Sequence, residues 1–270
     1  MRLINIIYFL VPFLGSSQNT EAINLNKDLF ICYGKISPEM IKGYGLVIIE
    51  TQHYSALEIE IFKSNNETVL GYLSITEVHK SSFFYNEIKE YTIGENKNWG
   101  SSYLDISNVT CREVLFKVIS KMIEKGVDGL FLDNLDNVSQ WGNLKEKKEP
   151  LISFIKEIKD RNPSLYLMQN SGLFLNNELK KSTNSILVES LLTAYNFETR
   201  SYTFRDAALK KKLLKNLKKI TNKSVYLVEY ADELEMKNKI EEELKSIGFP
   251  YFIGNINLQT NPNFSTKNKN

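Results

Sequence analysis

Eight short apolar runs recur along the chain, with space for a helix between most of them. Each run is 5–7 residues long and rich in Val, Ile, Leu, Phe or Tyr, and the runs are Phe30–Gly34, Leu46–Glu50, Val69–Ile75, Gly129–Asn134, Leu165–Asn170, Ile186–Ser190, Val225–Tyr230 and Tyr251–Asn255. Continuous apolar runs of this length are typical of parallel strands buried on both faces. Eight such strands alternating with helices over about 240 residues predict a single-domain (β/α)8 TIM barrel of the α/β class. A doubly wound open sheet is the alternative, which we disfavour because no glycine-rich phosphate loop follows the first run.

Local signals mark where several of the intervening helices begin and end. The segment Thr110-Cys111-Arg112-Glu113 has the pattern of a capping box, which predicts Thr110 as the N-cap of a helix. Gly126 stands where a glycine in the left-handed conformation would end that helix. Ser37-Pro38 predicts a short helix with proline in its first turn.

The first 22 residues differ from the rest of the chain. Arg2 is followed by a nearly continuous apolar stretch from Leu3 to Leu14 and then by small residues, as in a secretory signal peptide. This pattern predicts a signal peptide over 1–22 and hence a secreted or periplasmic protein; the alternative is a buried first strand or helix. The barrel domain is then expected over 23–260, followed by a loose tail over 261–270. No other stretch is long enough to span a membrane.

The composition limits the classes of function. Lys and Arg number 34 and Asp and Glu number 32, a formal net charge of +2, which gives no support for a nucleic-acid binder. The 2 Cys and 2 His lack the spacing of a zinc site, so we expect no metal or cofactor, and we expect a monomer. A basic stretch could favour a membrane or polyanion surface, but leucines at helical spacing beside it favour a solvated helix face. Its lysines are Lys210, Lys211, Lys212, Lys215, Lys218 and Lys219.

Polar residues end most of the predicted strands. In TIM barrels the active site lies at the carboxyl ends of the strands, so these residues would share one rim. They are Glu50, Glu77, Asp133 followed by Asn134 and Asp136, Asn170, Glu189, Glu229 and Asn255. Acidic residues often begin solvated loops, but so many on one rim would repel one another and raise some of their pKa values, which is typical of a functional site.

Asp133 and Glu189 form the most specific pair on this rim. They end strands four and six, which are next-but-one neighbours around the barrel. Two carboxylates placed across a scissile bond are what glycoside hydrolysis requires, one as nucleophile and one as acid and base. Several aromatic residues could stack on sugar rings, although core packing or a rim contact is the alternative for each of them. They are Tyr33, Tyr54, Tyr72, Trp99, Trp141, Tyr195 and Tyr230, and the two at strand ends, Tyr33 and Tyr230, are favoured.

Three blocks of the sequence resemble glycoside hydrolase family 114, the endo-α-1,4-polygalactosaminidase-like TIM-barrel proteins. The blocks run over residues 44–50, 69–77 and 126–136, and the resemblance extends over about 28–258. It implies that Asp133 and Glu189 are the catalytic acids. Thr76 and Leu104 depart from the residues usual in the family, which bears on the substrate subsites more than on the chemistry.

The rim and the resemblance together predict a cationic amino-sugar polymer as the substrate. Ammonium groups would offset the repulsion between carboxylates that the reaction itself does not need. We expect Asp133 as the nucleophile and Glu189 as the acid and base. A non-catalytic carbohydrate-binding barrel of the cell surface is the alternative. The expected substrate-binding residues are Tyr33, Glu50, Tyr72, Glu77, Asn134, Asp136, Asn170, Glu229 and Tyr230.

Overall fold

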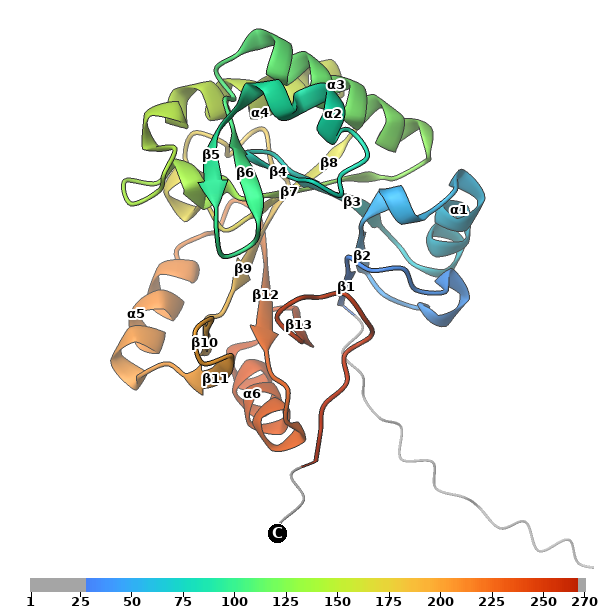
Figure 1. The fold of residues 1–270 in the computed structure, drawn as a ribbon. Helices are drawn as coiled ribbons and strands as arrows, with labels where there is room; N and C mark the ends of the chain where they lie inside the picture. Colours follow the sequence, from blue (N-terminus) through green and yellow to red (C-terminus); the bar gives the residue numbers. More distant parts are fainter. Residues whose placement is uncertain (1–27, 267–270) are drawn as a thin grey trace, which may run out of the picture.

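The computed structural model describes residues 28–266, and the predicted signal peptide therefore lies outside the described residues. Eight parallel strands form one sheet in the order β1-β2-β3-β7-β8-β9-β12-β13 (Figure 1). The strands are β1 (Leu29–Cys32), β2 (Leu46–Ile49), β3 (Val69–Ser74), β7 (Gly129–Asp133), β8 (Tyr166–Asn170), β9 (Ser185–Glu189), β12 (Ser224–Tyr230) and β13 (Tyr251–Gly254). They coincide with the eight predicted runs to within a few residues at each end.

The sheet curls into a nearly closed barrel because its first and last strands meet. The rings of Phe30 on β1 and Phe252 on β13 lie 5.5 Å apart. Just beyond these strands, the backbone amide of Tyr33 donates to the carbonyl of Leu258 at 2.7 Å. Every residue of β1, β2 and β13 is buried, which explains the continuous apolar runs. The predicted single-domain TIM barrel is confirmed.

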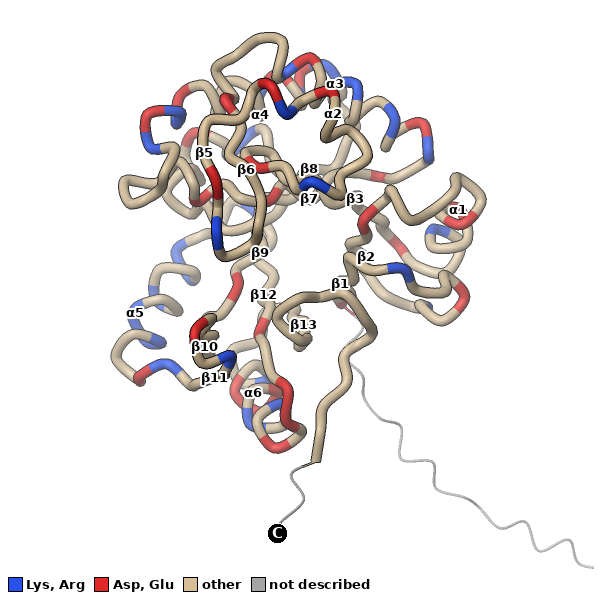
Figure 2. Tube along the Cα trace, viewed as in Figure 1, with Lys and Arg blue, Asp and Glu red and all other residues tan. Residues whose placement is uncertain are grey.

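Helices cover the outside of the barrel (Figure 1). They are α1 (Ala56–Asn65), α3 (Val109–Glu124), α4 (Lys148–Arg161), α5 (Ala207–Leu217) and α6 (Leu234–Ile247). Regular alternation fails at two places, because β1 is followed only by the 3-10 turn η1 (Pro38–Met40) and β8 only by η6 (Leu173–Leu175). The lysines of α5 lie along the outer side of the barrel (Figure 2).

The predicted N-cap of α3 is wrong by two residues. Asn108, not Thr110, is the N-cap, and its side-chain oxygen accepts the backbone N–H groups of Thr110 at 2.8 Å and Cys111 at 3.1 Å. Asparagine is among the best N-cap residues, so it begins the helix earlier than the capping-box pattern suggested. The predicted end of the helix is confirmed, because Gly126 has a φ of +100°.

Two insertions at the mouth of the barrel were not predicted. One, between β3 and α3, is a small antiparallel sheet of β4 (Glu77–His79), β5 (Thr92–Asn96) and β6 (Ser101–Leu104), and it also carries the short helix α2 (Tyr85–Ile88). The other, after β9, is the hairpin of β10 (Thr193–Asn196) and β11 (Ser201–Phe204). Their tips meet, since the rings of Trp99 and Phe197 lie 5.2 Å apart and edge to face.

The C-terminal segment is tied to the barrel as far as it is described. The backbone amide of Ser265 donates to the carbonyl of Asp232 at 2.8 Å, and Ser265 forms a β-bridge with Glu233. The loose tail predicted over 261–270 stays a prediction, and residues 267–270 lie outside the described residues. Among residues 28–266, no helix is both long and apolar enough to cross a membrane.

Candidate active site

A cavity of about 1030 Å³ opens at the carboxyl ends of the barrel strands. Its volume is at the upper end of the range of roughly 300–1,000 Å³ that is usual for small-molecule sites, which leaves room for more than one sugar ring. All but one of the predicted site residues line it. Those that do are Tyr33, Glu50, Tyr72, Glu77, Asp133, Asn134, Asp136, Asn170, Glu189 and Tyr230.

Asn170 bridges the two predicted catalytic carboxylates. Its side-chain Nδ2 donates to Oδ1 of Asp133 at 2.7 Å and to Oε1 of Glu189 at 2.6 Å. Both oxygens bind the same nitrogen, so the distance between them is at most about 5.3 Å. This limit is shorter than the roughly 6.5–9.5 Å between the carboxyl groups of inverting glycosidases and is compatible with a retaining enzyme. The strands β7, β8 and β9 are adjacent in the sheet, and this order places the bridge between the two acids.

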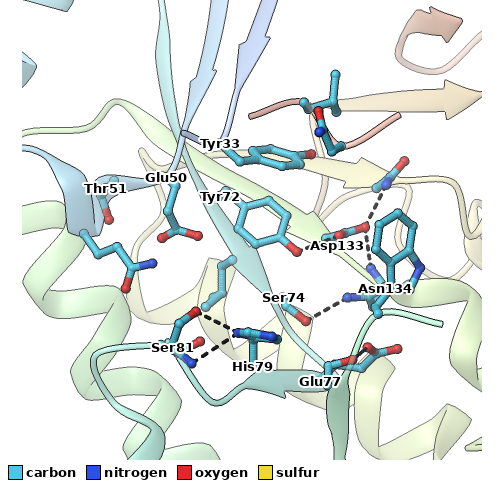
Figure 3. A pocket seen from close by; sticks show the side chains of 18 of the residues that line it. Tyr33, Glu50, Thr51, Tyr72, Ser74, Glu77, His79, Ser81, Asp133 and Asn134 are labelled. Atoms are coloured by element: carbon cyan, nitrogen blue, oxygen red, sulfur yellow. Dashed lines mark hydrogen bonds between the residues drawn. The ribbon is translucent and has the colours of Figure 1, made fainter. Parts of the chain in front are cut away.

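Two tyrosines orient the same carboxylates. The hydroxyl of Tyr72 donates to Oδ2 of Asp133 at 2.8 Å, as Figure 3 shows, and the hydroxyl of Tyr230 donates to Oε2 of Glu189 at 2.6 Å. The ring of Tyr33 packs against that of Tyr72, with centroids 4.4 Å apart. Three of the tyrosines proposed to stack on sugars, Tyr33, Tyr72 and Tyr230, thus lie beside the acids, and two of them hold the carboxylates through their hydroxyl groups.

The backbone adopts the left-handed conformation immediately after Asn170 and after each of the two acids that it bridges. Asn134, Ser171 and Ser190 follow Asp133, Asn170 and Glu189, and their φ angles are +66°, +51° and +58°. Serine rarely adopts this region, and such strained residues cluster at functional sites because the surrounding structure must hold them there. These left-handed residues end β7, β8 and β9 directly after Asp133, Asn170 and Glu189, whose side chains point toward one another.

Both acids are partly buried, and this desolvation raises the pKa of each carboxyl group. The pKa of Glu189 is raised further by the negative charge of Asp133. Asp133 accepts three hydrogen bonds that favour its charged form, from Asn170, Tyr72 and the backbone amide of Asn134. Glu189 accepts two. This difference favours an ionised Asp133 beside a protonated Glu189.

Two other cavity carboxylates are tied to the protein itself. Glu77 accepts the side-chain amides of Asn96 at 3.1 Å and Asn137 at 2.7 Å, and also the hydroxyl of Ser101. These bonds join β4 to the β5–β6 hairpin and to the segment after β7. Asp136 accepts the backbone amide of Gly172 at 3.1 Å, which joins the loops after β7 and β8. Both carboxylates therefore shape the rim of the cavity.

Glu229 corrects one of the predicted substrate contacts. It is fully buried and does not line the cavity. Its carboxylate accepts the backbone amides of Leu192 at 2.7 Å and Thr193 at 3.0 Å, and the hydroxyl of Thr193 at 2.7 Å. Glu229 therefore fixes the segment between β9 and β10 instead of facing a ligand.

Replacing Glu229 by Gln should lower stability and leave substrate binding unchanged. The new NH₂ group would face a backbone N–H donor, at a cost of about 1–3 kcal/mol.

Burial raises the pKa of Glu229 from near 4.5 to about 7. The folded protein therefore binds a proton there that the unfolded chain has lost, and this contribution to stability falls as the pH rises from about 4.5 to 7. Urea unfolding at pH 5 and pH 8 should show a smaller loss for Glu229→Gln at pH 8. An unchanged stability, or a raised KM in the folded variant, would contradict the structural role; exposed Glu242→Gln is the control.

Several cavity residues were missed because they lie on the first insertion and on the last loop. Ser81–Phe84 follow β4, and Ile256–Gln259 follow β13. Trp99, a candidate for sugar stacking, lines the cavity from the tip of the β5–β6 hairpin, which was not predicted. The run Lys97-Asn98-Trp99-Gly100 between two β-branched and aromatic segments was a signal for this hairpin. Within residues 28–266, no group of three or more His, Cys, Asp and Glu side chains is arranged to hold a metal ion.

Comparison with known proteins gives a family match over most of the chain. The model of glycoside-hydrolase family GH114 matches residues 17–264. An uncharacterized protein of Thermotoga maritima is 22% identical over 138 residues, which cover 46% of this chain and 43% of that protein. An uncharacterized protein of Methanocaldococcus jannaschii is 25% identical over 218 residues, covering 73% and 61% respectively. The chain thus spans about half the length of the curated relatives that it matches.

Two solved structures share the fold. The glycoside hydrolase domain of PelA from Pseudomonas aeruginosa superposes with a TM-score of 0.75 at 20% identity, over 86% of this chain and 96% of that one. Ega3 of Aspergillus fumigatus, solved in complex with galactosamine, superposes with a TM-score of 0.65 at 17% identity, over 88% and 92%. At these identities the likeness bears on the fold alone.

Proposed function

The chain belongs to glycoside hydrolase family GH114, and from this premise we propose that it cleaves an α-linked amino-sugar polymer with Asp133 and Glu189 as its catalytic acids. The observation that supports the proposal is the single amide of Asn170, which binds both carboxylates and keeps the two bound oxygens closer together than the carboxyl groups of an inverting glycosidase. The galactosamine bound to Ega3 supports the choice of an amino sugar.

The proposed reaction has two steps. Asp133 attacks the anomeric carbon while Glu189 gives its proton to the leaving glycosidic oxygen, so that the glycosidic C–O bond breaks and a glycosyl ester forms on Asp133. Water then attacks the same carbon, gives a proton to Glu189 and releases Asp133 as a carboxylate. The configuration at the anomeric carbon is retained after two inversions.

The electrostatics of the pair suit both steps. Before the first step, the charge of Asp133 and burial keep the pKa of Glu189 raised, so Glu189 holds the proton that it must donate. Once Asp133 is an ester, its charge is gone and the pKa of Glu189 falls. Glu189 can then accept a proton from water as a general base.

The charge of the cavity supports a cationic substrate. Five carboxylates line it (Glu50, Glu77, Asp133, Asp136 and Glu189), and no Lys or Arg of the described residues does. A site with one sign of charge and low-dielectric walls concentrates ligands of the opposite sign. Ammonium groups on a deacetylated hexosamine chain would fit this field, whereas uronic acids would be repelled.

The polymer preference is tested by turnover on a deacetylated and a fully N-acetylated α-1,4-galactosamine polymer over a salt series. We expect faster cleavage of the deacetylated polymer and an apparent affinity that falls as salt rises, because screening acts over about 8 Å at physiological ionic strength. Faster cleavage of the acetylated polymer without salt dependence would contradict the cationic substrate but leave the glycosidase. Binding without cleavage of either polymer would favour the alternative, a non-catalytic carbohydrate-binding barrel.

A further inference from the structure

Glu50 differs from the other carboxylates that line the cavity. Asn170 bridges the catalytic pair, amides hold Glu77, and Asp136 ties two loops together. Glu50 precedes the 3-10 turn η2 (Thr51–His53), but its side chain makes no capping hydrogen bond. Among the described residues, only the backbone amide of Gln52 and the charge of Lys125 favour its ionised form. No side chain among the described residues donates a hydrogen bond to the carboxylate of Glu50.

The positive charge beside Glu50 is engaged elsewhere. Lys125, at the end of α3, donates through Nζ to the carbonyls of Thr51 at 2.7 Å and Tyr54 at 2.9 Å. It therefore fixes the loop that carries Glu50. Burial prevails over this charge and raises the pKa of Glu50 to about 7. A partly buried carboxylate with so little compensation is costly to ionise, so a cation entering the cavity would bind favourably there.

Glu50 also faces the reaction centre. In Figure 3 its carboxylate points into the same hollow as Tyr72, and the Tyr72 ring lies between Glu50 and Asp133. Tyr72 and Tyr33 both experience the negative charges of Glu50 and of Asp133, as expected when the two carboxylates share this part of the cavity. Glu50 and Asp133 thus line the same cavity, on either side of the Tyr72 ring in this view.

We propose that Glu50 is a specificity-determining residue that binds the ammonium group of the amino sugar next to the one held between Asp133 and Glu189. This assignment rests on the proposed glycosidase activity. On this proposal, the preference for a deacetylated substrate comes mainly from Glu50, and not from the combined electrostatic field of all the carboxylates that line the cavity. An N-acetyl group at that position would bring no positive charge and would not favour the ionised form of Glu50.

The test compares Glu50→Gln with wild type on α-1,4-galactosamine oligomers, fully deacetylated or fully N-acetylated. We expect KM for the deacetylated oligomer to rise about tenfold or more with little change in kcat, because a hydrogen-bonded charge pair is lost. KM for the acetylated oligomer should not change. Glu60→Gln is the matched control, since it removes the same charge from an exposed position on α1 that does not line the cavity. Glu50→Asp keeps the charge and should keep the preference for the deacetylated oligomer.

Binding without turnover gives a second readout. Calorimetric titration of the Asp133→Asn protein with the deacetylated oligomer should give a Kd that rises about tenfold or more when Glu50→Gln is added. Equal losses on both oligomers would mean a structural role and overturn the proposal, as would an unchanged KM and Kd. If wild type cleaves neither oligomer while binding both, the proposed hydrolase fails instead, and the Kd comparison still decides the role of Glu50.

Discussion

Asp133→Asn and Glu189→Gln should each lower turnover by at least about 1,000-fold while leaving the fold intact. Each substitution keeps the shape of the side chain and removes one of the two functions that the reaction needs. The amide of the Asp133→Asn variant could not form a glycosyl ester, and the amide of the Glu189→Gln variant could not donate a proton to the leaving oxygen. Because burial raises the pKa of both carboxyl groups, their neutral replacements should not destabilise the protein.

Chemical rescue separates the two roles. Asp133→Gly should regain activity with azide, which fills the space of the nucleophile and gives a glycosyl azide of inverted configuration. Glu189→Gln should retain activity on aryl glycosides whose leaving group needs no proton. The exposed Glu87→Gln is the control for loss of a carboxylate. Full turnover in either near-isosteric variant would remove the pair from the mechanism, and the opposite pattern of rescue would exchange the two roles.

The barrel could be predicted from the sequence because strands buried on both faces must be apolar throughout. The eight runs were visible without any knowledge of how they pair. The two mouth insertions were not, because β4, β5, β10 and β11 are short, partly exposed strands whose residues show no continuous apolar run. Their positions depend on contacts between distant segments, such as the one between Trp99 and Phe197.

The error at Glu229 could have been avoided from the sequence. Successive residues of a strand point to opposite faces, so Glu229 and Tyr230 cannot both face the mouth of the barrel. Tyr230 reaches Glu189, and Glu229 therefore points away from the cavity, toward the segment after β9. The same alternation places Tyr72 and Ser74 on one face of β3. For Asn170, the strand end was predicted but the bridging role was not, because it depends on β8 lying between β7 and β9.

Asn170→Asp should lower turnover about 100-fold or more and move both limbs of the pH–rate profile to higher pH. The substitution keeps the shape of Asn170 but replaces its NH₂ donor with an acceptor. The new carboxyl group would then lie against those of Asp133 and Glu189, to which the amide of Asn170 now donates hydrogen bonds. Their mutual repulsion raises the pKa of both catalytic groups. Asp133 then ionises only at higher pH, which moves the acid limb, and Glu189 keeps its proton to higher pH, which moves the alkaline limb.

The matched control for this variant is Asn257→Asp. Asn257 lines the same cavity and is exposed, and its side-chain oxygen accepts only the backbone amide of Gln259 among the described residues. The same charge is therefore added to the cavity without touching the pair, and the limbs should stay close to those of wild type. If the two variants shift the profile equally, the effect comes from the field of the cavity, and Asn170 does not couple the acids. If neither the rate nor the profile of Asn170→Asp changes, the bridge has no part in the reaction. A shift confined to Asn170→Asp would assign to one amide the separation, the orientation and the relative acidity of the two groups that carry out the hydrolysis.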